Sequence, residues 1–376
     1  MELDAFRVAL DAWLDDHAAE LAPAMPDSTS LDEHMAQVRK VKRLAFDAGW
    51  MRWGWPESVG GLGGSSILRA YLGDALTARD LVDPGVYCMT EVLAPTMIDY
   101  APPELAAVMV PRLLRGDETW CQGFSEPGTG SNLAALQCRA VRAGDGWRVS
   151  GQKVWTSFAQ YADRCVLLTR TGAPDSAHRG ITALFVDMDS PGITVRPLET
   201  MNGSAEFSEV FFDDVAVPGG RTLGQVDQGW SIAMDLLPYE RSTALWHRGV
   251  FLHRRFGELL SSAPPDALTA TAVGDAFLQL YAFRARSRAT QYRMADGETL
   301  GAETSIDKVL LASAEQMVFE LVGDGLAESA MLGGDAASER WRADFLYARA
   351  ATIYGGTAEI QRNVIARRLL DLGADR

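Results

Sequence analysis

The sequence is poor in cysteine and histidine, and neither residue is arranged to bind a metal ion. The four cysteines are far apart and form no C-x-x-C pair, and the five histidines are scattered without an H-E-x-x-H motif. We therefore expect no metal site and four reduced thiols, most of them packed in the interior.

A long apolar run and a surplus of basic residues are also missing. No stretch approaches the roughly 20 apolar residues of a membrane span, and residues 1–19 form an acidic amphipathic segment instead of a signal peptide. The net charge of −15 argues against nucleic acid or an anionic membrane as a partner. We expect a cytoplasmic chain without a membrane span.

The sequence has no alternating β–α pattern and no G-x-G-x-x-G between a strand and a helix, which argues against a doubly wound sheet and a Rossmann nucleotide site. Instead, the hydrophobic period changes twice. It is helical over 1–118, strand-like over 119–228 and helical again over 229–376. The pattern predicts an α+β fold with an N-terminal helical domain, a middle β domain and a C-terminal helical bundle.

Local signals refine this expectation. Ser65 and Ser66 are expected to cap a helix beginning at Ile67, and Pro103 to stand in the first turn of another helix. The turn Gly144-Asp145-Gly146 predicts a hairpin, and Pro264-Pro265 predicts a connection between helices.

Three short motifs are candidates for chemistry. The stretch Cys121–Asn132 combines Gly128 and Gly130 with hydroxyl side chains, which suits close approach to a flat ligand or a plain polar turn. In Gly151–Ser157, a Trp followed by hydroxyls suits a ring and its polar edge, or is ordinary strand core. In Ile353–Arg362, two glycines precede a helix that Thr357 can cap, which suits a polarised carbonyl oxygen or a simple turn.

Together and in this order, the three motifs resemble the acyl-CoA dehydrogenase family, with its T/S-E-P-G-x-G-S-D, W-x-T/S and Y-E-G-T-x-x-I-Q-R patterns. The loop from Trp55 to Gly63 is similar to the family's P-E-x-x-G-G-x-G. The resemblance spans essentially the whole chain. It implies a barrel-like middle sheet, a C-terminal four-helix bundle, FAD as cofactor, an acyl-CoA substrate in fatty acid or lipid metabolism and an electron-transfer flavoprotein as acceptor.

The resemblance also implies where cofactor and substrate lie. The flavin would sit between the β domain and the C-terminal bundle. The residues implied for cofactor binding are Phe124, Ser125, Ser131, Trp155, Ser157, Thr357 and Glu359, and those implied for substrate binding are Ser131, Leu237, Tyr239, Arg241 and Tyr354.

One position departs from the family pattern. Many members carry a catalytic Glu directly after the Tyr of the last motif, where this chain has Gly355. Removal of an α-proton from a thioester needs a base and donors on the carbonyl oxygen. Some branches place the base on a helix before an Arg, and Glu240-Arg241 matches that pattern. We predict Glu240 as the base and the Gly355 amide as a donor; Glu359 is the alternative base, and Glu126 is expected to be structural.

The partner-subunit contacts to the flavin are also incomplete. The R-x-x-F-G segment that relatives use is missing from its expected place, since His253 to Gly257 come too early, and the glycine-rich loop is reduced to Val322–Gly325. A homodimer or tetramer is expected, with a hetero-oligomer as the alternative.

Two other functions remain possible for the chain: a silent partner subunit of a mixed, steroid side-chain assembly, and a flavin oxygenase or acyl-carrier-protein oxidase on the same fold.

Overall fold

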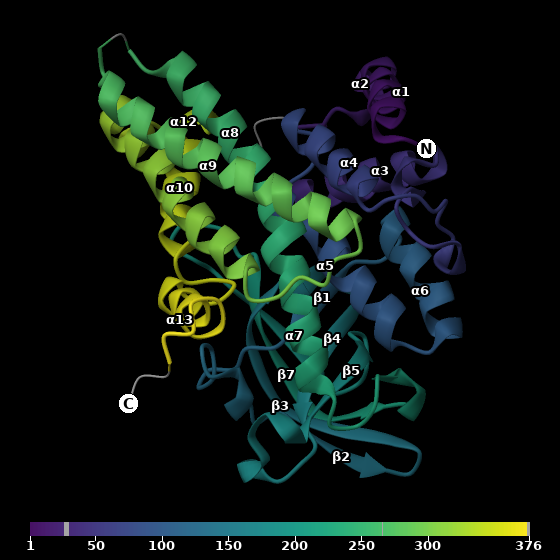
Figure 1. Ribbon diagram of the computed structural model, residues 1–376. Coiled ribbons are helices and arrows are strands. Elements are labelled where there is room, and N and C mark those ends of the chain that lie inside the picture. The colour runs from purple at the N-terminus through teal and green to yellow at the C-terminus, as the bar shows by residue number, and fades with distance from the viewer. Residues whose placement is uncertain (26–29, 265, 374–376) are drawn as a thin grey trace.

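The computed structural model describes residues 1–25, 30–264 and 266–373 (Figure 1). Helices precede and follow one block of strands, which confirms the predicted fold class. The first group of helices is α1 (Leu3–Asp16), α2 (Ala18–Leu21), α3 (Leu31–Asp47), α4 (Ile67–Ala78), α5 (Pro84–Tyr100) and α6 (Pro103–Arg115), with the short turns η1 (Trp50–Arg52) and η2 (Glu57–Val59).

The helix ends test two of the local predictions. Pro103 occupies the first position of α6, as predicted. Ser66 precedes α4 but makes no side-chain cap hydrogen bond, so that part of the capping prediction is wrong. Its backbone is already helical, whereas a capping side chain needs an extended backbone to reach the free N–H groups. Ser65 supplies only a 3.4 Å contact from its Oγ to the N–H of Ile67.

Eight strands form the middle sheet in the order β6-β7-β3-β2-β4-β5-β8, with β1 beside β4. Antiparallel β2 and β3 turn at Gly144 and Asp145, which confirms the hairpin. A single parallel pair, Arg139 with Arg170, joins β2 to β4. The strands are β1 (Trp120–Gly123), β2 (Arg139–Ala143), β3 (Gly146–Ser157), β4 (Arg164–Arg170), β5 (Ile181–Asp187), β6 (Ile193–Leu198), β7 (Phe207–Val217) and β8 (Thr222–Leu223), with η3 (Leu133–Ala135), η4 (Ala159–Tyr161), η5 (Pro174–Gly180) and η6 (Gly219–Arg221) between them.

The C-terminal helices begin with a long rod in which α7 (Gly229–Tyr239) and α8 (Leu245–Ser262) are joined by the π-helical turn η7 (Glu240–Ala244). The proline connection lies between α8 and α9; Pro265 itself is outside the described residues. The rest of the bundle is α9 (Ala270–Ala295), α10 (Thr304–Gly325), α11 (Ala327–Leu332), α12 (Ala336–Tyr347), η8 (Ala348–Ala350) and α13 (Ala358–Arg368).

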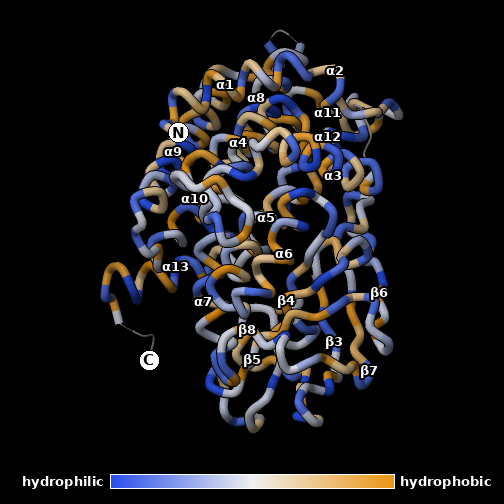
Figure 2. Tube along the Cα trace, turned by 90° about the vertical axis from the view of Figure 1, so that its right-hand side faces the viewer, coloured by the Kyte–Doolittle hydropathy of each residue, from blue (hydrophilic) through white to orange (hydrophobic). Residues whose placement is uncertain are grey.

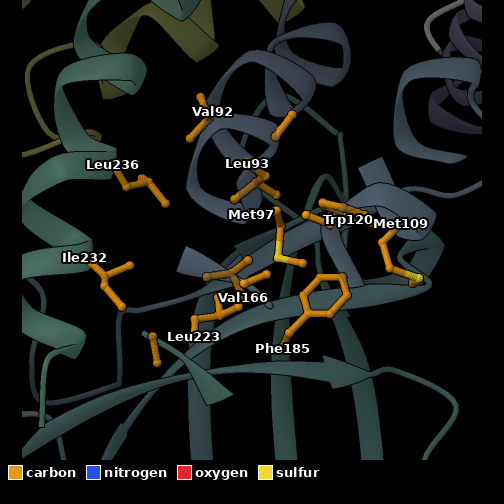
Figure 3. Packing of buried hydrophobic residues seen from close by; sticks show 14 of the residues in the cluster. Val92, Leu93, Met97, Met109, Trp120, Val166, Phe185, Leu223, Ile232 and Leu236 are labelled. Carbon is orange, nitrogen blue, oxygen red and sulfur yellow. The ribbon is translucent and has the colours of Figure 1, made fainter. Parts of the chain in front are cut away.

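One hydrophobic core joins all three groups and thereby fixes the rod. Both overall views place α5 at the centre of the molecule (Figures 1 and 2). In Figure 3, Leu93 and Met97 of α5 face Val166 and Phe185 of the sheet, with Leu236 of α7 beside them. Because these side chains are fully buried, α7 has little freedom to slide, and the residues that follow it are held at a defined height above the sheet.

The four cysteines are free and buried, as predicted. No helix among the described residues combines the length and apolar character needed to cross a membrane.

Candidate active site

Glu240 opens the π-helical turn of the rod. Pro238, two residues earlier, has no N–H to donate inside the helix. A π turn inserts one extra residue into a helix and is found mostly at functional sites. The extra residue of the π turn therefore changes the direction in which the Glu240 side chain points from the helix. The side chain is half-buried, not fully exposed to solvent.

The structure brings Glu240 and Gly355 together from segments far apart in the sequence. A Cβ added to Gly355 would lie 3.1 Å from Glu240 Oε1 and 3.3 Å from Lys308 Cε. On the other side, Gln122 Nε2 of β1 donates to Glu240 Oε2 at 3.3 Å. The carboxylate thus sits in a slot that exists because residue 355 has no side chain.

The backbone of this slot depends on consecutive glycines. Gly355 and Gly356 have φ values of +62° and +87°, a left-handed conformation that other residues adopt only with strain. Gln361 Nε2 donates to the carbonyl of Gly355 at 3.0 Å and contacts that of Gly356 at 3.3 Å. Within the described chain, no group accepts from the Gly355 N–H. This donor is available to a ligand oxygen, and Thr357 Oγ1 caps α13 as predicted by accepting from Ile360.

A buried ionic network stands behind the slot. Lys308 of α10 is 2 % exposed, donates to the carbonyl of Ala351 and lies 4.2 Å from the centre of the Tyr354 ring. Burial lowers the pKa of Lys308 to about 8, partly offset by the charges of Glu315 and Glu240. Tyr354 donates through its hydroxyl to Glu315 Oε2 at 3.2 Å. Tyr354 is therefore fixed from both sides and holds the segment before Gly355 in place.

Two further groups lie close to the carboxylate of Glu240. The Arg241 Nη2 is 3.4 Å from the position a Cβ on Gly356 would take, and burial lowers the pKa of this guanidinium. Burial raises the pKa of the Cys88 thiol on α5, and the charge of Glu240 adds to the effect. Cys88 thus stays a neutral thiol on the α5 wall of the site.

Residues of the first two motifs converge at the ends of β1 and β3. The buried Lys153 donates from Nζ to the carbonyl of Phe124 at 3.1 Å and to Glu126 Oε1 at 2.8 Å. Glu126 also accepts the N–H groups of Gln137 and Cys138, at 2.6 and 2.8 Å, which confirms its structural role. This buried pair fixes the loop that carries Ser125.

Trp155 stands apart from the rest of β3. Its φ is +58°, and 57 % of its large side chain is exposed, although one edge meets Phe207. The hydroxyl oxygen of its neighbour Thr156 is buried without a hydrogen-bond partner in the described structure. Positions Gly128 and Gly130 also face open space. An exposed indole, an orphaned hydroxyl and an open glycine turn fit a flat, polar-edged ring.

The other predicted residues occupy the surroundings. Ser125, Ser157, Leu237 and Tyr239 are half-buried, whereas Ser131 is exposed. Glu359, the alternative base, is exposed on α13. Among the described residues, no contact directs its side chain into the slot.

Sequence reasoning assigned no role to Gln122, Lys308 or Glu315. Gln122 lies inside the Cys121–Asn132 motif but carries no signal of its own. The signal for the other two was their spacing: Lys308 and Glu315 are seven residues apart, two helical turns, and both fall on the buried face of α10. Charged residues on such a face are rarely buried without a partner, which would have marked them as a network.

Two family models match the chain. The one described as acyl-CoA dehydrogenase, middle domain, matches residues 121–215, and the one described as acyl-CoA dehydrogenase, C-terminal domain, matches residues 227–370. These ranges include Trp155, Glu240 and Gly355.

Known relatives extend the match over the whole chain. Acyl-CoA dehydrogenase IpdE1 of Mycobacterium tuberculosis (strain H37Rv) is 34 % identical over 380 residues, covering 99 % of this chain and 98 % of the relative. A solved Tcur3481-Tcur3483 steroid ACAD is 25 % identical with a TM-score of 0.82, covering 100 % and 98 % of the two chains. The ChsE4-ChsE5 complex from Mycobacterium tuberculosis is 26 % identical with a TM-score of 0.78, covering 99 % and 98 %.

Proposed function

The chain belongs to the acyl-CoA dehydrogenase family, and from this premise we propose that it binds FAD and removes hydrogen from the α and β carbons of an acyl-CoA thioester, with Glu240 as the base. The observation that carries the proposal is the slot at Gly355, where a half-buried carboxylate from the rod faces a free backbone N–H.

The described residues fit the cofactor. The exposed face of Trp155 and the buried, unpaired hydroxyl of Thr156 suit a flavin ring and its polar edge. Phe124, Ser125, Ser131 and Ser157 would hold the ring region, and Thr357 with Glu359 would lie near the rest of the cofactor at the start of α13. When bound, FAD supplies a hydride acceptor for the β-hydrogen of the substrate.

The chain's own groups then have separate tasks. The N–H of Gly355 donates to the thioester oxygen, which makes the α-hydrogen more acidic. Glu240 removes the α-proton through Oε1, while Gln122 holds Oε2. Lys308 and Arg241 provide positive charge near a half-buried carboxylate. Leu237, Tyr239 and Tyr354 would line the acyl channel on the rod and loop sides.

We further propose that the chain works within a mixed assembly. Two similar structures are complexes named for two proteins, one of them called a steroid ACAD. Arg254 and Arg255, the nearest match to the arginine that relatives lend to a neighbouring flavin, are already paired within this chain with Asp80, Glu258 and Asp344. A second subunit of the same family would supply the missing contact, and an electron-transfer flavoprotein would take the electrons.

The test is anaerobic reduction of the FAD-loaded protein by a panel of acyl-CoA thioesters that includes a steroid side-chain thioester. Bleaching of the flavin band by at least one thioester is expected, with a loss of roughly 10³-fold or more in rate for Glu240→Gln. The matched control is Glu104→Gln at an exposed position of α6, which should keep the wild-type rate. Equal bleaching in both variants would move the base away from Glu240.

Two outcomes distinguish the alternatives. A chain that takes up no FAD, alone or co-expressed with a second family subunit, would leave only the silent-partner role. Rapid reoxidation of the reduced flavin by air would favour an oxygenase or an acyl-carrier-protein oxidase, since a dehydrogenase passes its electrons to another flavoprotein.

A further inference from the structure

Lysine is rare in this chain, and most of it is buried. The sequence has only four lysines, at positions 40, 42, 153 and 308, whereas arginine is abundant. Lys42, Lys153 and Lys308 are 5 %, 0 % and 2 % exposed. A lysine is almost never fully buried unless it is paired, and unlike arginine it can lose its proton inside a protein. Each buried lysine therefore needs a partner.

Two of the buried lysines have partners away from the candidate base. Lys153 Nζ is 2.8 Å from Glu126 Oε1, in the pair that fixes the loop after β1. Lys42 lies on α3, and the largest effect of a neighbouring charge on it comes from Glu91 of α5. Lys308 differs from both, because it lies at the slot described above.

Lys308 and Glu240 reach this slot from different helices. Lys308 Cε and Glu240 Oε1 lie 3.3 and 3.1 Å from the same point, the Cβ position on Gly355. The Lys308 ammonium donates to the carbonyl of Ala351 and has two further N–H groups. Burial lowers the pKa of Lys308 to about 8, and the charges of Glu315 and Glu240 oppose this shift. Because the effect of two charges on each other is mutual, Lys308 also favours the ionised form of Glu240.

Other titratable side chains surround this pair: Glu315 on α10, Arg241 on the π turn, Arg248 on α8, Cys88 on α5 and Tyr354 before Gly355. Burial raises the pKa of Tyr354 and of the Cys88 thiol, so both stay neutral. The carboxylate of Glu315 is 2.5 Å from Arg248 Nη2, so these two charges largely cancel.

The remaining charges near the pair do not change with pH in the neutral range. Arg241 keeps its charge, because a guanidinium does not lose its proton in proteins. Arg286 of α9 is paired with Asp307, with 3.5 Å between Nε and Oδ2. Lys308 is thus the neighbour of Glu240 whose charge responds to pH.

We propose that Lys308 is a positioning residue of the reaction: its ammonium keeps the carboxylate of Glu240 ionised and directed at the thioester. A bound apolar acyl chain removes water from this carboxylate and thereby favours its neutral form, which cannot accept a proton. The ammonium opposes that effect from behind the slot, without touching the substrate. The inference rests on the proposed function, because it takes Glu240 to be the base.

The pH dependence of flavin reduction separates this role from a purely structural one. Lys308→Met keeps most of the side-chain stem and removes the charge. With the thioester that bleaches the flavin best, the acid limb of the rate profile should move up by about one pH unit, so that the variant is roughly ten-fold slower at about pH 6. Above about pH 9, wild-type Lys308 has itself lost its proton, and the two rates should agree within about two-fold.

Lys42→Met is the matched control for the loss of a buried lysine. Lys42 also has one hydrogen bond to lose, to Thr90 Oγ1 at 2.9 Å, and it lies on another helix. Its replacement should leave the acid limb at the wild-type pH. The inference is overturned if Lys308→Met slows flavin reduction by the same factor at every pH, or if Lys42→Met moves the acid limb equally far.

A second measurement needs neither turnover nor Lys308→Met. Because the chain has only four lysines, ¹³C-labelled lysine gives few side-chain signals in nuclear magnetic resonance, and the signal missing from Lys308→Arg belongs to Lys308. In the FAD-loaded protein, Glu240→Gln should lower the titration midpoint of that signal by about one pH unit, since the carboxylate charge is gone. The signal of Lys42 should keep its midpoint. An unchanged midpoint for Lys308 overturns the inference.

Failure of the inference and failure of the proposed function are separable. Flavin bleaching that depends on Glu240, with the same acid limb in Lys308→Met as in the wild type, retains the reaction and rejects the role of Lys308. A Lys308 signal that responds to Glu240→Gln, in a protein that no thioester bleaches, retains the coupling of the two charges and rejects the reaction.

Discussion

At the scale of single residues, two features of Gly355 disfavour any side chain at this position. Its backbone is left-handed, and a Cβ would lie 3.1 Å from Glu240 Oε1. Gly355→Ala should therefore lower the free energy of unfolding by about 1–2 kcal/mol through backbone strain. It should also slow flavin reduction roughly 10- to 100-fold, because the added methyl group displaces the base. Urea unfolding and anaerobic stopped-flow absorbance measure the two effects.

Gly144 in the β2–β3 turn is the matched control, with a φ of +61° and no atom within 4 Å of its Cβ position. Gly144→Ala should show the loss of stability alone. The interpretation fails if both variants slow flavin reduction equally, or if Gly355→Ala reduces the flavin at the wild-type rate.

The sequence was sufficient to propose Glu240 and Gly355 as partners, because the family pattern requires a base and one position lacked it. It was insufficient for Gln122 and Lys308. These residues reach Glu240 from β1 and α10, which lie more than 60 residues before and after it in the sequence. Their contact depends on tertiary packing, which the local hydrophobic period of the sequence does not specify.

At the scale of elements, α4 and α8 approach closely at Gly73, where a Cβ would lie 2.1 Å from the Nε2 of the fully buried His247. Gly73→Ala should destabilise the protein by about 2–3 kcal/mol through overpacking. His247→Ala opens space at the same point. The loss in free energy of unfolding of the double variant should therefore be smaller than the sum of the two single losses by about 1 kcal/mol or more. Urea unfolding of the four proteins measures this difference.

A matched cycle uses Gly274 of α9, whose Cβ position is open. Gly274→Ala should stabilise the helix by roughly 0.5–1 kcal/mol and combine additively with His247→Ala. Additivity in the Gly73 cycle as well would show that positions 73 and 247 are not coupled, contrary to the close packing described above.

Element types were predictable from hydrophobic period, but helix phase and helix ends were not. Val309, Leu310 and Met317 mark α10 as a helix, yet all three are only half-buried, while Lys308 and Glu315 face the interior. An ionic network inside the bundle outweighed the apolar pattern there. Ser66 fails as a cap for a similarly local reason, since its backbone has already entered the helical conformation.

At the scale of the whole molecule, α9 presents Phe277, Leu278 and Tyr281 outward with 45 %, 63 % and 63 % of each side chain exposed. Large apolar residues gathered on one helix face mark a protein contact. We expect the double variant Leu278→Glu, Tyr281→Glu to shift the protein, or its mixed assembly, towards single chains in light scattering after gel filtration.

Val8→Glu on α1 is the control, because Val8 is 74 % exposed and the same charge is introduced on a different helix. It should leave the assembly intact. An unchanged mass for the α9 variant would place the subunit contact on another surface.

The slot at Gly355 also bears on ancestry. Glutamates at both 240 and 355 would crowd two acids into one pocket already shared with Lys308, where both cannot readily ionise; glutamate at neither leaves no base. With Glu240 as the proposed base, a stepwise move of the base between the two positions is therefore expected to pass through a weakened enzyme. Duplication into paired subunits removes that obstacle, because one copy can sustain the reaction while the other drifts.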